Sequence, residues 1–165
     1  LNAIDLITNE KDRAENIMIV DILRNDLSKV CEIGTIKVPE ILKLESFLKV
    51  HHLTSVIKGK LKSDKNWIDL LKACWPGGSI TGAPKLRSCQ RLYEIEECER
   101  GPYCGSFMKI DWSGEFDSNI LIRSFMVKNK TINIYAGCGI VCDSDPKEET
   151  EELKWKLLPL IDSLK

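Results

Sequence analysis

The sequence predicts an α+β fold in which helices pack around an antiparallel sheet. Apolar residues recur with a helical period near both ends of the chain and again after a glycine-rich stretch. Residues 103–135 instead alternate with the period of two that is typical of strands. With 165 residues, the chain is long enough for one domain with a hydrophobic core.

The first predicted helix covers residues 9–30, and Asn9 is placed to cap its N-terminus. Asp12 and Glu15 are three residues apart, so both carboxylates lie on one side of this helix. The residue pattern alone explains this pair equally well as a solvated acidic face or as a binding site. We interpret Arg24-Asn25-Asp26, near the helix end, as local hydrogen bonding rather than chemistry.

The next part of the chain mixes the two periods. We predict one or two short strands within residues 33–48, a helix that starts over residues 50–57, and another helix over residues 64–74. On a helix, the adjacent residues His51 and His52 point to different faces and cannot jointly hold one metal. One of them could donate a proton, although a structural role is the commoner outcome for a lone histidine.

The glycine-rich stretch, residues 75–85, contains three glycines and two prolines and should form neither a regular helix nor a strand. Apolar residues spaced three apart then predict a helix over residues 85–95. The amides at such a helix N-terminus favour an anionic ligand, and Ser79 and Thr81 add hydroxyl groups. The alternative is a plain loop with Pro84 at the first helical turn.

Three predicted strands follow, over residues 103–112, 120–128 and 131–135, and turn residues between them indicate an antiparallel meander. Arg123 falls inside the second of these strands. A buried guanidinium needs a partner, and a carboxylate ligand and a protein acid are equally open possibilities.

A segment with two glycines, residues 136–141, precedes the last predicted helix, residues 145–165. The glycines allow backbone amides to approach an anion, or they mark a bulge. On the helix, Glu149 and Glu152 share one face with Lys156. An acid pair on each of two helices could form an all-oxygen site, which suits Mg²⁺.

The composition is that of an ordinary globular protein, with a net charge of −1, 30% charged and 43% hydrophobic residues. It gives no electrostatic case for binding nucleic acid or a membrane, and no apolar run could span a bilayer. The seven scattered cysteines lack metal-site spacing, which predicts reduced thiols in a cytoplasmic protein. Because the chain begins at Leu1 rather than Met, we expect a fragment.

Taken together, the motifs identify a family. The chain resembles the C-terminal part of the chorismate-utilising enzymes, which include anthranilate synthase component I, aminodeoxychorismate synthase component I, isochorismate synthase and salicylate synthase. The resemblance covers essentially all 165 residues. The motifs that carry it occur in the family's order: Glu10-Lys11-Asp12-Arg13-Ala14-Glu15-Asn16, His51-His52-Leu53, residues 76–85, Ile122-Arg123, residues 136–141 and the closing acidic helix.

The resemblance implies a fold of two large sheets packed together with helices outside. Residues 1–165 would be a single partial chorismate-binding domain that lacks its N-terminal portion, and we therefore expect exposed apolar surface. Within the family, Pro76-Gly77-Gly78-Ser79 is most similar to the aminodeoxychorismate synthases, because anthranilate synthases usually carry Ala-Gly-Thr in place of Gly-Gly-Ser.

The resemblance also implies roles for individual residues. Glu15 and Glu152 match the Mg²⁺ ligands, and Asp12 and Glu149 match acids that hold the metal's waters. Lys156 matches a residue near the carboxylate on the chorismate ring. Two further sets match positions around the substrate. Those near the enolpyruvyl carboxylate are Tyr103, Arg123, Gly137, Cys138 and Gly139, and those near the departing C4 hydroxyl are His52 and Ser79.

Two residues depart from the family pattern. Cys138 replaces the usual alanine or glycine, which narrows the expected pocket, and Leu121 replaces a common threonine. A catalytic glutamate and a Pro-Ile-x-Gly-Thr element of the family precede the region that aligns with Leu1. The x of that element is lysine in aminodeoxychorismate synthases and alanine in anthranilate synthases.

The implied activity is amination of chorismate to aminodeoxychorismate in folate and p-aminobenzoate biosynthesis, with ammonia from a glutamine amidotransferase partner. Anthranilate synthase is the alternative within the family. Two other classes remain open: a non-catalytic fragment that binds anions or contacts a subunit, and an α+β domain without a site. The last alternative predicts that Glu15 and Glu152 lie far apart.

Overall fold

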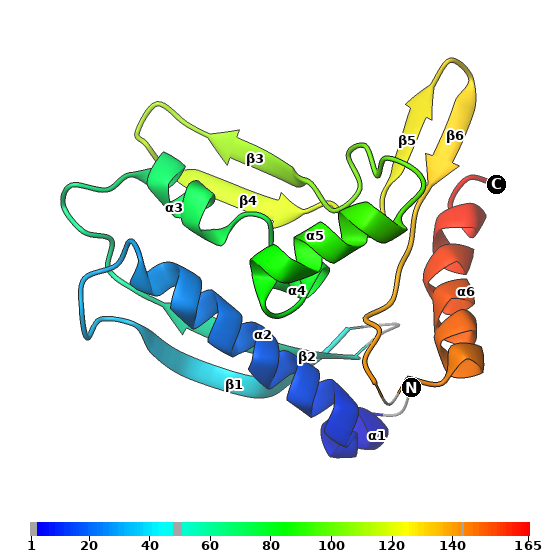
Figure 1. Ribbon diagram of the computed structural model, residues 1–165, viewed down its shortest axis with the longest axis horizontal. Helices are drawn as coiled ribbons and strands as arrows, with labels where there is room; N and C mark the ends of the chain where they lie inside the picture. The colour runs from blue at the N-terminus through cyan, green and yellow to red at the C-terminus, as the bar shows by residue number, and fades with distance from the viewer. Residues whose placement is uncertain (1–2, 48–50, 143) are drawn as a thin grey trace. The chain divides into compact units, whose positions relative to one another are not determined.

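The computed structural model describes residues 3–47, 51–142 and 144–165, which form two compact units that divide after Gln90. The first unit contains the elements from α1 to α4 and the start of α5 (Figure 1). Their bounds are α1 Ala3–Thr8, α2 Glu10–Ser28, β1 Lys37–Ser46, β2 His51–Lys58, α3 Trp67–Cys74, α4 Gly78–Thr81 and α5 Lys85–Ile95. The second unit contains β3 Ser106–Ile110, β4 Phe116–Ile120, β5 Phe125–Lys128, β6 Thr131–Ile134 and α6 Pro146–Asp162. The predicted α+β class is confirmed.

Helix α2 is the longest element of the first unit and begins where the sequence predicts. Asn9 caps it, because its side-chain oxygen accepts a hydrogen bond from the Asp12 amide at 3.1 Å. The helix packs on the β1–β2 hairpin (Figure 1). Asn16 fixes this contact, since its side chain donates to the Leu53 carbonyl at 3.0 Å and accepts from the Ser55 hydroxyl at 2.6 Å.

The helix predicted over residues 50–57 is wrong: His51–Lys58 is strand β2, and Val50 lies outside the described residues. The spacing of its apolar residues imitates one turn of a helix, but the segment also contains the β-branched residues Thr54, Val56 and Ile57, which favour strands. Antiparallel pairing with β1, from Ser46 opposite His51 to Lys37 opposite Lys58, decides the outcome.

The glycine-rich stretch is more ordered than the sequence predicts. It follows α3, whose capping box joins Asn66 and Asp69, and it contains the single helical turn α4. Gly82, with φ 98°, ends this turn in a conformation that residues with a Cβ rarely adopt. The predicted helix over residues 85–95 is confirmed as α5.

In the second unit, the meander is replaced by two separate antiparallel hairpins, β3–β4 and β5–β6. The continuous strand predicted over residues 120–128 is wrong, because β4 ends at Ile120 and β5 begins at Phe125. Arg123 lies in the link between them with a φ of 51°, which no regular strand contains. Segment 136–141 then leads from β6 to α6, which Asp145 caps, with Pro146 in the first turn.

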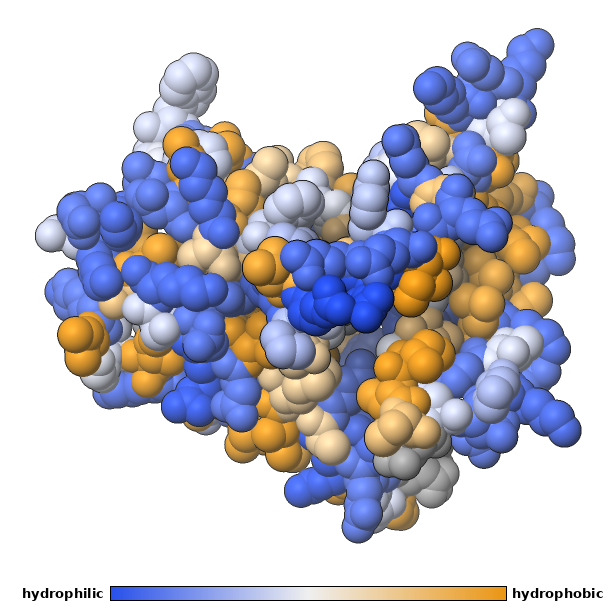
Figure 2. Space-filling view, viewed as in Figure 1, coloured by the Kyte–Doolittle hydropathy of each residue, from blue (hydrophilic) through white to orange (hydrophobic). Residues whose placement is uncertain are grey.

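The core is small. Among the described residues, the buried apolar side chains are Val20, Val30 and Cys31, all in the first unit. Large apolar side chains such as Ile33, Tyr93 and Trp112 are almost fully exposed, and Figure 2 shows apolar residues over much of the face that it draws. The expected exposed apolar surface is therefore present. Within the described ranges, no helix has the length and apolar character needed to cross a membrane.

Candidate active site

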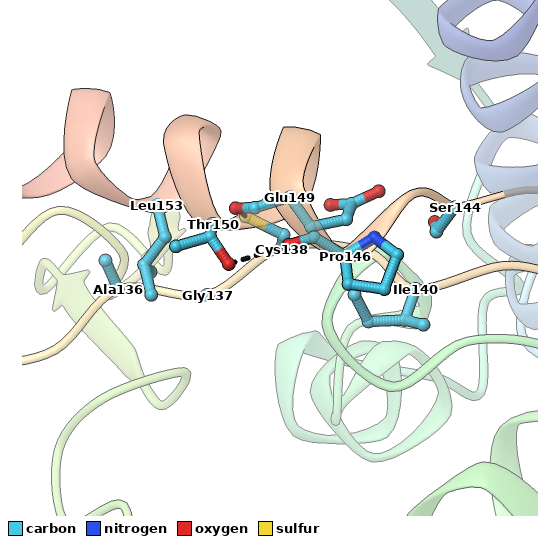
Figure 3. Close-up of a pocket in the computed structure, with 9 residues that line it drawn as sticks. All are labelled: Ala136, Gly137, Cys138, Ile140, Ser144, Pro146, Glu149, Thr150 and Leu153. Carbon is cyan, nitrogen blue, oxygen red and sulfur yellow. Dashed lines mark hydrogen bonds between the residues drawn. The ribbon is translucent and has the colours of Figure 1, made fainter.

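The candidate site in the second unit lies where segment 136–141 runs beside the first turns of α6 (Figure 3). A pocket of about 420 Å³ opens between them. Its lining combines the backbone of Gly137 with side chains from both elements, among them Cys138, Ile140, Glu149 and Leu153. The pocket can therefore offer backbone and carboxylate groups to a small ligand within a mostly apolar wall.

Three potential metal ligands converge at this pocket. One ligand atom from each of Cys138, Glu149 and Glu152 lies within 4.8 Å of the other two. The two glutamates are one helical turn apart on α6, and Glu149 is only 7% exposed. Cys138 is held against this turn, because its thiol donates to the Glu149 carbonyl at 3.5 Å.

Lys156 joins the cluster from the next turn of α6. Its Nζ lies 2.6 Å from Glu152 Oε1, 3.1 Å from the Gly137 carbonyl oxygen and 3.8 Å from Cys138 Sγ. Burial nevertheless raises the pKa of the Cys138 thiol, and the nearby Lys156 charge opposes this only in part. The thiol is therefore neutral at physiological pH, beside one ammonium and two carboxyl groups.

Tyr103 approaches segment 136–141 from the turn before β3. Its ring stacks on Tyr135, with ring centroids 5.6 Å apart. A Cβ on Gly137 would lie 2.8 Å from the Tyr103 hydroxyl oxygen, so a larger residue there would require the tyrosine side chain to shift. Burial is the main cause that raises the pKa of Tyr103 to about 12, which keeps this hydroxyl protonated and able to donate a hydrogen bond.

The remaining predicted residues of this unit are more exposed. Gly139 and Arg123 are both exposed, and no hydrogen bond or ion pair engages the Arg123 guanidinium within the part of the chain that the structure describes. The expectation that Arg123 is a buried strand residue is thus wrong. Its positive charge is instead available to an anion from solvent.

The other predicted residues lie in the first unit. Asp12 and Glu15 sit near the start of α2, Asp12 half-buried and Glu15 exposed. His52 lies on β2, and its ring forms an edge-to-face pair with that of Phe47, at a centroid distance of 5.8 Å. Ser79 is exposed on α4, which packs against α2. Helix α2 therefore contacts both elements that carry the residues predicted to lie near the C4 hydroxyl.

The carboxylates fit the predicted Mg²⁺ in their chemistry, because Mg²⁺ prefers oxygen ligands and few of them from protein. The Cys138 thiol does not fit, since sulfur is too soft a ligand for this ion. Glu15 and Glu152 belong to different units, and the structure describes each unit by itself. Their convergence on one cation stays a prediction.

The sequence analysis missed an ion pair that the structure places beside the glycine-rich stretch. Asp26 is 2% exposed and pairs with Lys85, in the interior of the first unit. The signal was present in the sequence: Asp26 lies four residues after Ile22 and four before Val30, on the apolar face of α2. A carboxylate in that register is buried and needs a cationic partner.

Comparison with known proteins identifies the class to which this fold and pocket belong. The family described as chorismate binding enzyme matches residues 2–162, and the chain is a member of that family. Its relatives carry two different names. Over 150 residues, 91% of the chain, it is 45% identical to aminodeoxychorismate synthase from Arabidopsis thaliana. It is 44% identical over 149 residues, 90% of the chain, to anthranilate synthase component 1 from Bacillus subtilis.

The fold agrees with this membership. Anthranilate synthase component I from Streptococcus pneumoniae superposes on 96% of the chain with a TM-score of 0.89, at 39% sequence identity. The chain spans 16% of the Arabidopsis protein, 29% of the Bacillus protein and 36% of the Streptococcus structure. Sequence identity is nearly equal for the two named activities, so it does not choose between them.

Proposed function

We propose that the protein containing this chain converts chorismate and ammonia to 4-amino-4-deoxychorismate and water, with Mg²⁺ as cofactor. The observation that carries the proposal is the cluster of Glu149, Glu152 and Lys156 against the Gly137–Cys138 backbone, in a chain of the chorismate-binding family. The Gly-Gly-Ser sequence of residues 77–79, which is most similar to the aminodeoxychorismate synthases of the family, favours this product.

The second unit would hold the two carboxylates of chorismate. The Lys156 ammonium is placed to pair with the ring carboxylate, once it turns from Glu152. For the enolpyruvyl carboxylate, the protonated Tyr103 hydroxyl, the Arg123 guanidinium and the amides of residues 137–139 supply donors. These groups bind and orient the substrate rather than react with it.

The first unit would act on the C4 hydroxyl. A hydroxyl leaves more readily when a proton or a hydrogen bond reaches its oxygen, because the departing hydroxide then becomes water. His52 and Ser79 are our candidates for this donation. Bound Mg²⁺, held by Glu15 and Glu152 with Asp12 and Glu149 nearby, would offset the repulsion between these acids and the anionic ring.

Ammonia would come from a glutamine amidotransferase subunit or domain. The seven cysteines are all free thiols in the structure, which favours a reducing compartment such as the cytoplasm. The second candidate function is anthranilate synthesis, because the Bacillus relative and the Streptococcus structure both carry the name anthranilate synthase component I.

The product decides between the two. We would incubate the intact protein with chorismate, Mg²⁺ and ammonium and separate the products by chromatography. Aminodeoxychorismate is the expected product, and its formation should stop with EDTA. Anthranilate as sole product would transfer the assignment to the second candidate. Calorimetric binding of chorismate without any turnover would instead support the non-catalytic alternative.

A further inference from the structure

Asp26 is the most deeply buried charged residue among those that the structure describes, with 2% of its surface exposed. Two lysines contact its carboxylate. The Nζ of Lys29, which caps the C-terminus of α2, lies 2.9 Å from Oδ1, and Lys85 forms an ion pair with Oδ2. Lys29 is half exposed, whereas Lys85 is 19% exposed, so the second pair is the internal one.

Lys85 also joins the two ends of the glycine-rich stretch. Its ammonium donates to the Cys74 carbonyl at 3.2 Å. Cys74 is the last residue of α3 and Lys85 is the first of α5, so residues 75–84 form a loop whose base is closed by one side chain. A lysine after a glycine-rich loop commonly reaches an anionic ligand. Here the ammonium turns inward instead, toward a carboxylate and a carbonyl of the protein.

The loop has a second attachment to the same helix. A Cβ on Gly78 would lie 2.4 Å from Ile22 Cγ2, so the loop backbone rests directly on α2. Ile22 is one turn before Asp26, on the same face. Helix α2 therefore holds the loop at its centre, next to Ser79, and at its base. The same helix carries Glu15 near its start.

We propose that Asp26 and Lys85 are positioning residues that fix the loop of residues 75–84 on α2. The pair thereby aligns Ser79 with Asp12 and Glu15, the two acidic residues that are predicted to act at the metal. This inference rests on the proposed function for its catalytic consequence. Neither residue touches substrate. Without the ion pair between Asp26 and Lys85, the loop keeps its contact at Gly78 but its two ends are no longer held together. Ser79 then samples positions away from the C4 hydroxyl.

The test uses the intact protein with the double variant Asp26→Asn/Lys85→Met, which removes both charges and avoids an unpaired buried ion. Asp21→Asn/Arg24→Met is the matched control, because Asp21 and Arg24 form an exposed pair on the same helix, 3.0 Å apart. Lys85→Arg is the conservative variant. It keeps a cation at this position, so it should retain most of the activity that the double variant loses.

The catalytic readout is the split between kcat and the KM for chorismate. We expect kcat to fall about tenfold or more in the double variant, since misplacement by about 1 Å can reduce rates by up to about 100-fold. The KM should change less than twofold, because the carboxylate-binding groups lie in the other unit. A purely stabilising role would lower the melting temperature while leaving the kcat of the folded enzyme unchanged, and that result would overturn the proposal.

Hydrogen exchange provides a readout that does not depend on activity. The amides of Ile80, Thr81 and Gly82 donate within the loop, to Gly77 and Gly78 carbonyls at 2.8–3.2 Å. We expect them to exchange about tenfold faster in the double variant, while α2 amides and the control variant stay unchanged. If the unmodified protein forms no product, the proposed function fails. Hydrogen exchange still decides whether the pair of Asp26 and Lys85 holds the loop. Unchanged protection of the loop amides in the double variant would refute that role.

Discussion

The Lys156 ammonium lies 2.6 Å from Glu152 Oε1, one turn earlier on α6, and also donates to the Gly137 carbonyl. This lysine therefore connects a predicted metal ligand to the backbone that is predicted to bind substrate. It also competes with a cation for one oxygen of Glu152. Two opposite effects follow from its removal, one on metal binding and one on turnover.

Replacing Lys156 by Met should strengthen Mg²⁺ binding and weaken catalysis. The Glu152 oxygen loses its internal cation, so the Mg²⁺ concentration for half-maximal binding should fall a few-fold, measured by calorimetry. The ring carboxylate loses an ionic hydrogen bond, so kcat/KM for chorismate should fall about 10- to 100-fold. Lys154→Met is the control, because Lys154 pairs with the exposed Glu151. Equal effects of the two substitutions would contradict the assigned role.

Glu152→Gln should abolish the response of activity to Mg²⁺. An amide has no negative charge, and a hard dication depends on carboxylate charge for most of its affinity. We expect the residual rate to be at least about 100-fold lower and insensitive to EDTA. Glu151→Gln changes the adjacent, exposed residue and should respond to Mg²⁺ like the unmodified protein. A Glu152→Gln variant that keeps its magnesium titration would remove this residue from the metal site.

How much of the site could be predicted depends on whether the signal was local. The face shared by Glu149, Glu152 and Lys156 follows from helical spacing alone, and the structure brings all three together. The pair of Asp26 with Lys85 joins residues 59 positions apart, and no local pattern specifies such a partner. The burial of Asp26 could have been predicted, but the identity of its partner could not.

The same distinction between local and long-range signals explains which elements of the fold could be predicted. Helices α2 and α6 were predicted nearly to their ends because apolar periodicity continues through both, Asn9 caps the first and Pro146 stands in the first turn of the second. Strand β2 was missed because its pairing with β1 is a longer-range interaction than the helical spacing it imitates. The break at Arg123 was missed for a related reason. Nothing in Ile122-Arg123-Ser124 indicates the positive φ that Arg123 adopts between the two hairpins.

Tyr103 should titrate at unusually high pH in the folded protein. Its pKa is raised to about 12, mainly by burial, whereas the unfolded chain should ionise near 10. A group whose folded pKa is raised stabilises the fold fully below its unfolded pKa, and the contribution is lost as pH rises. The free energy of unfolding should therefore decline between about pH 10 and 12, and less so in Tyr103→Phe. The difference between ultraviolet titrations of the unmodified protein and of Tyr103→Phe isolates this tyrosine from the other two. A midpoint near 10 in that difference would contradict the burial argument.

Gly78→Ala should destabilise the protein, because the new methyl group would lie 2.4 Å from Ile22 Cγ2 and the loop would have to move off α2. Overpacking of this kind costs about 1–3 kcal/mol, measured as the free energy of unfolding in denaturant. Turnover should fall as well, since Ser79 is the next residue. Adding Ile22→Ala creates room for the methyl group, so the double variant should be more stable than the sum of the two single changes predicts. Simple additivity in this cycle would mean that Gly78 and Ile22 are not in contact, and the attachment of the loop centre to α2 would have to be abandoned.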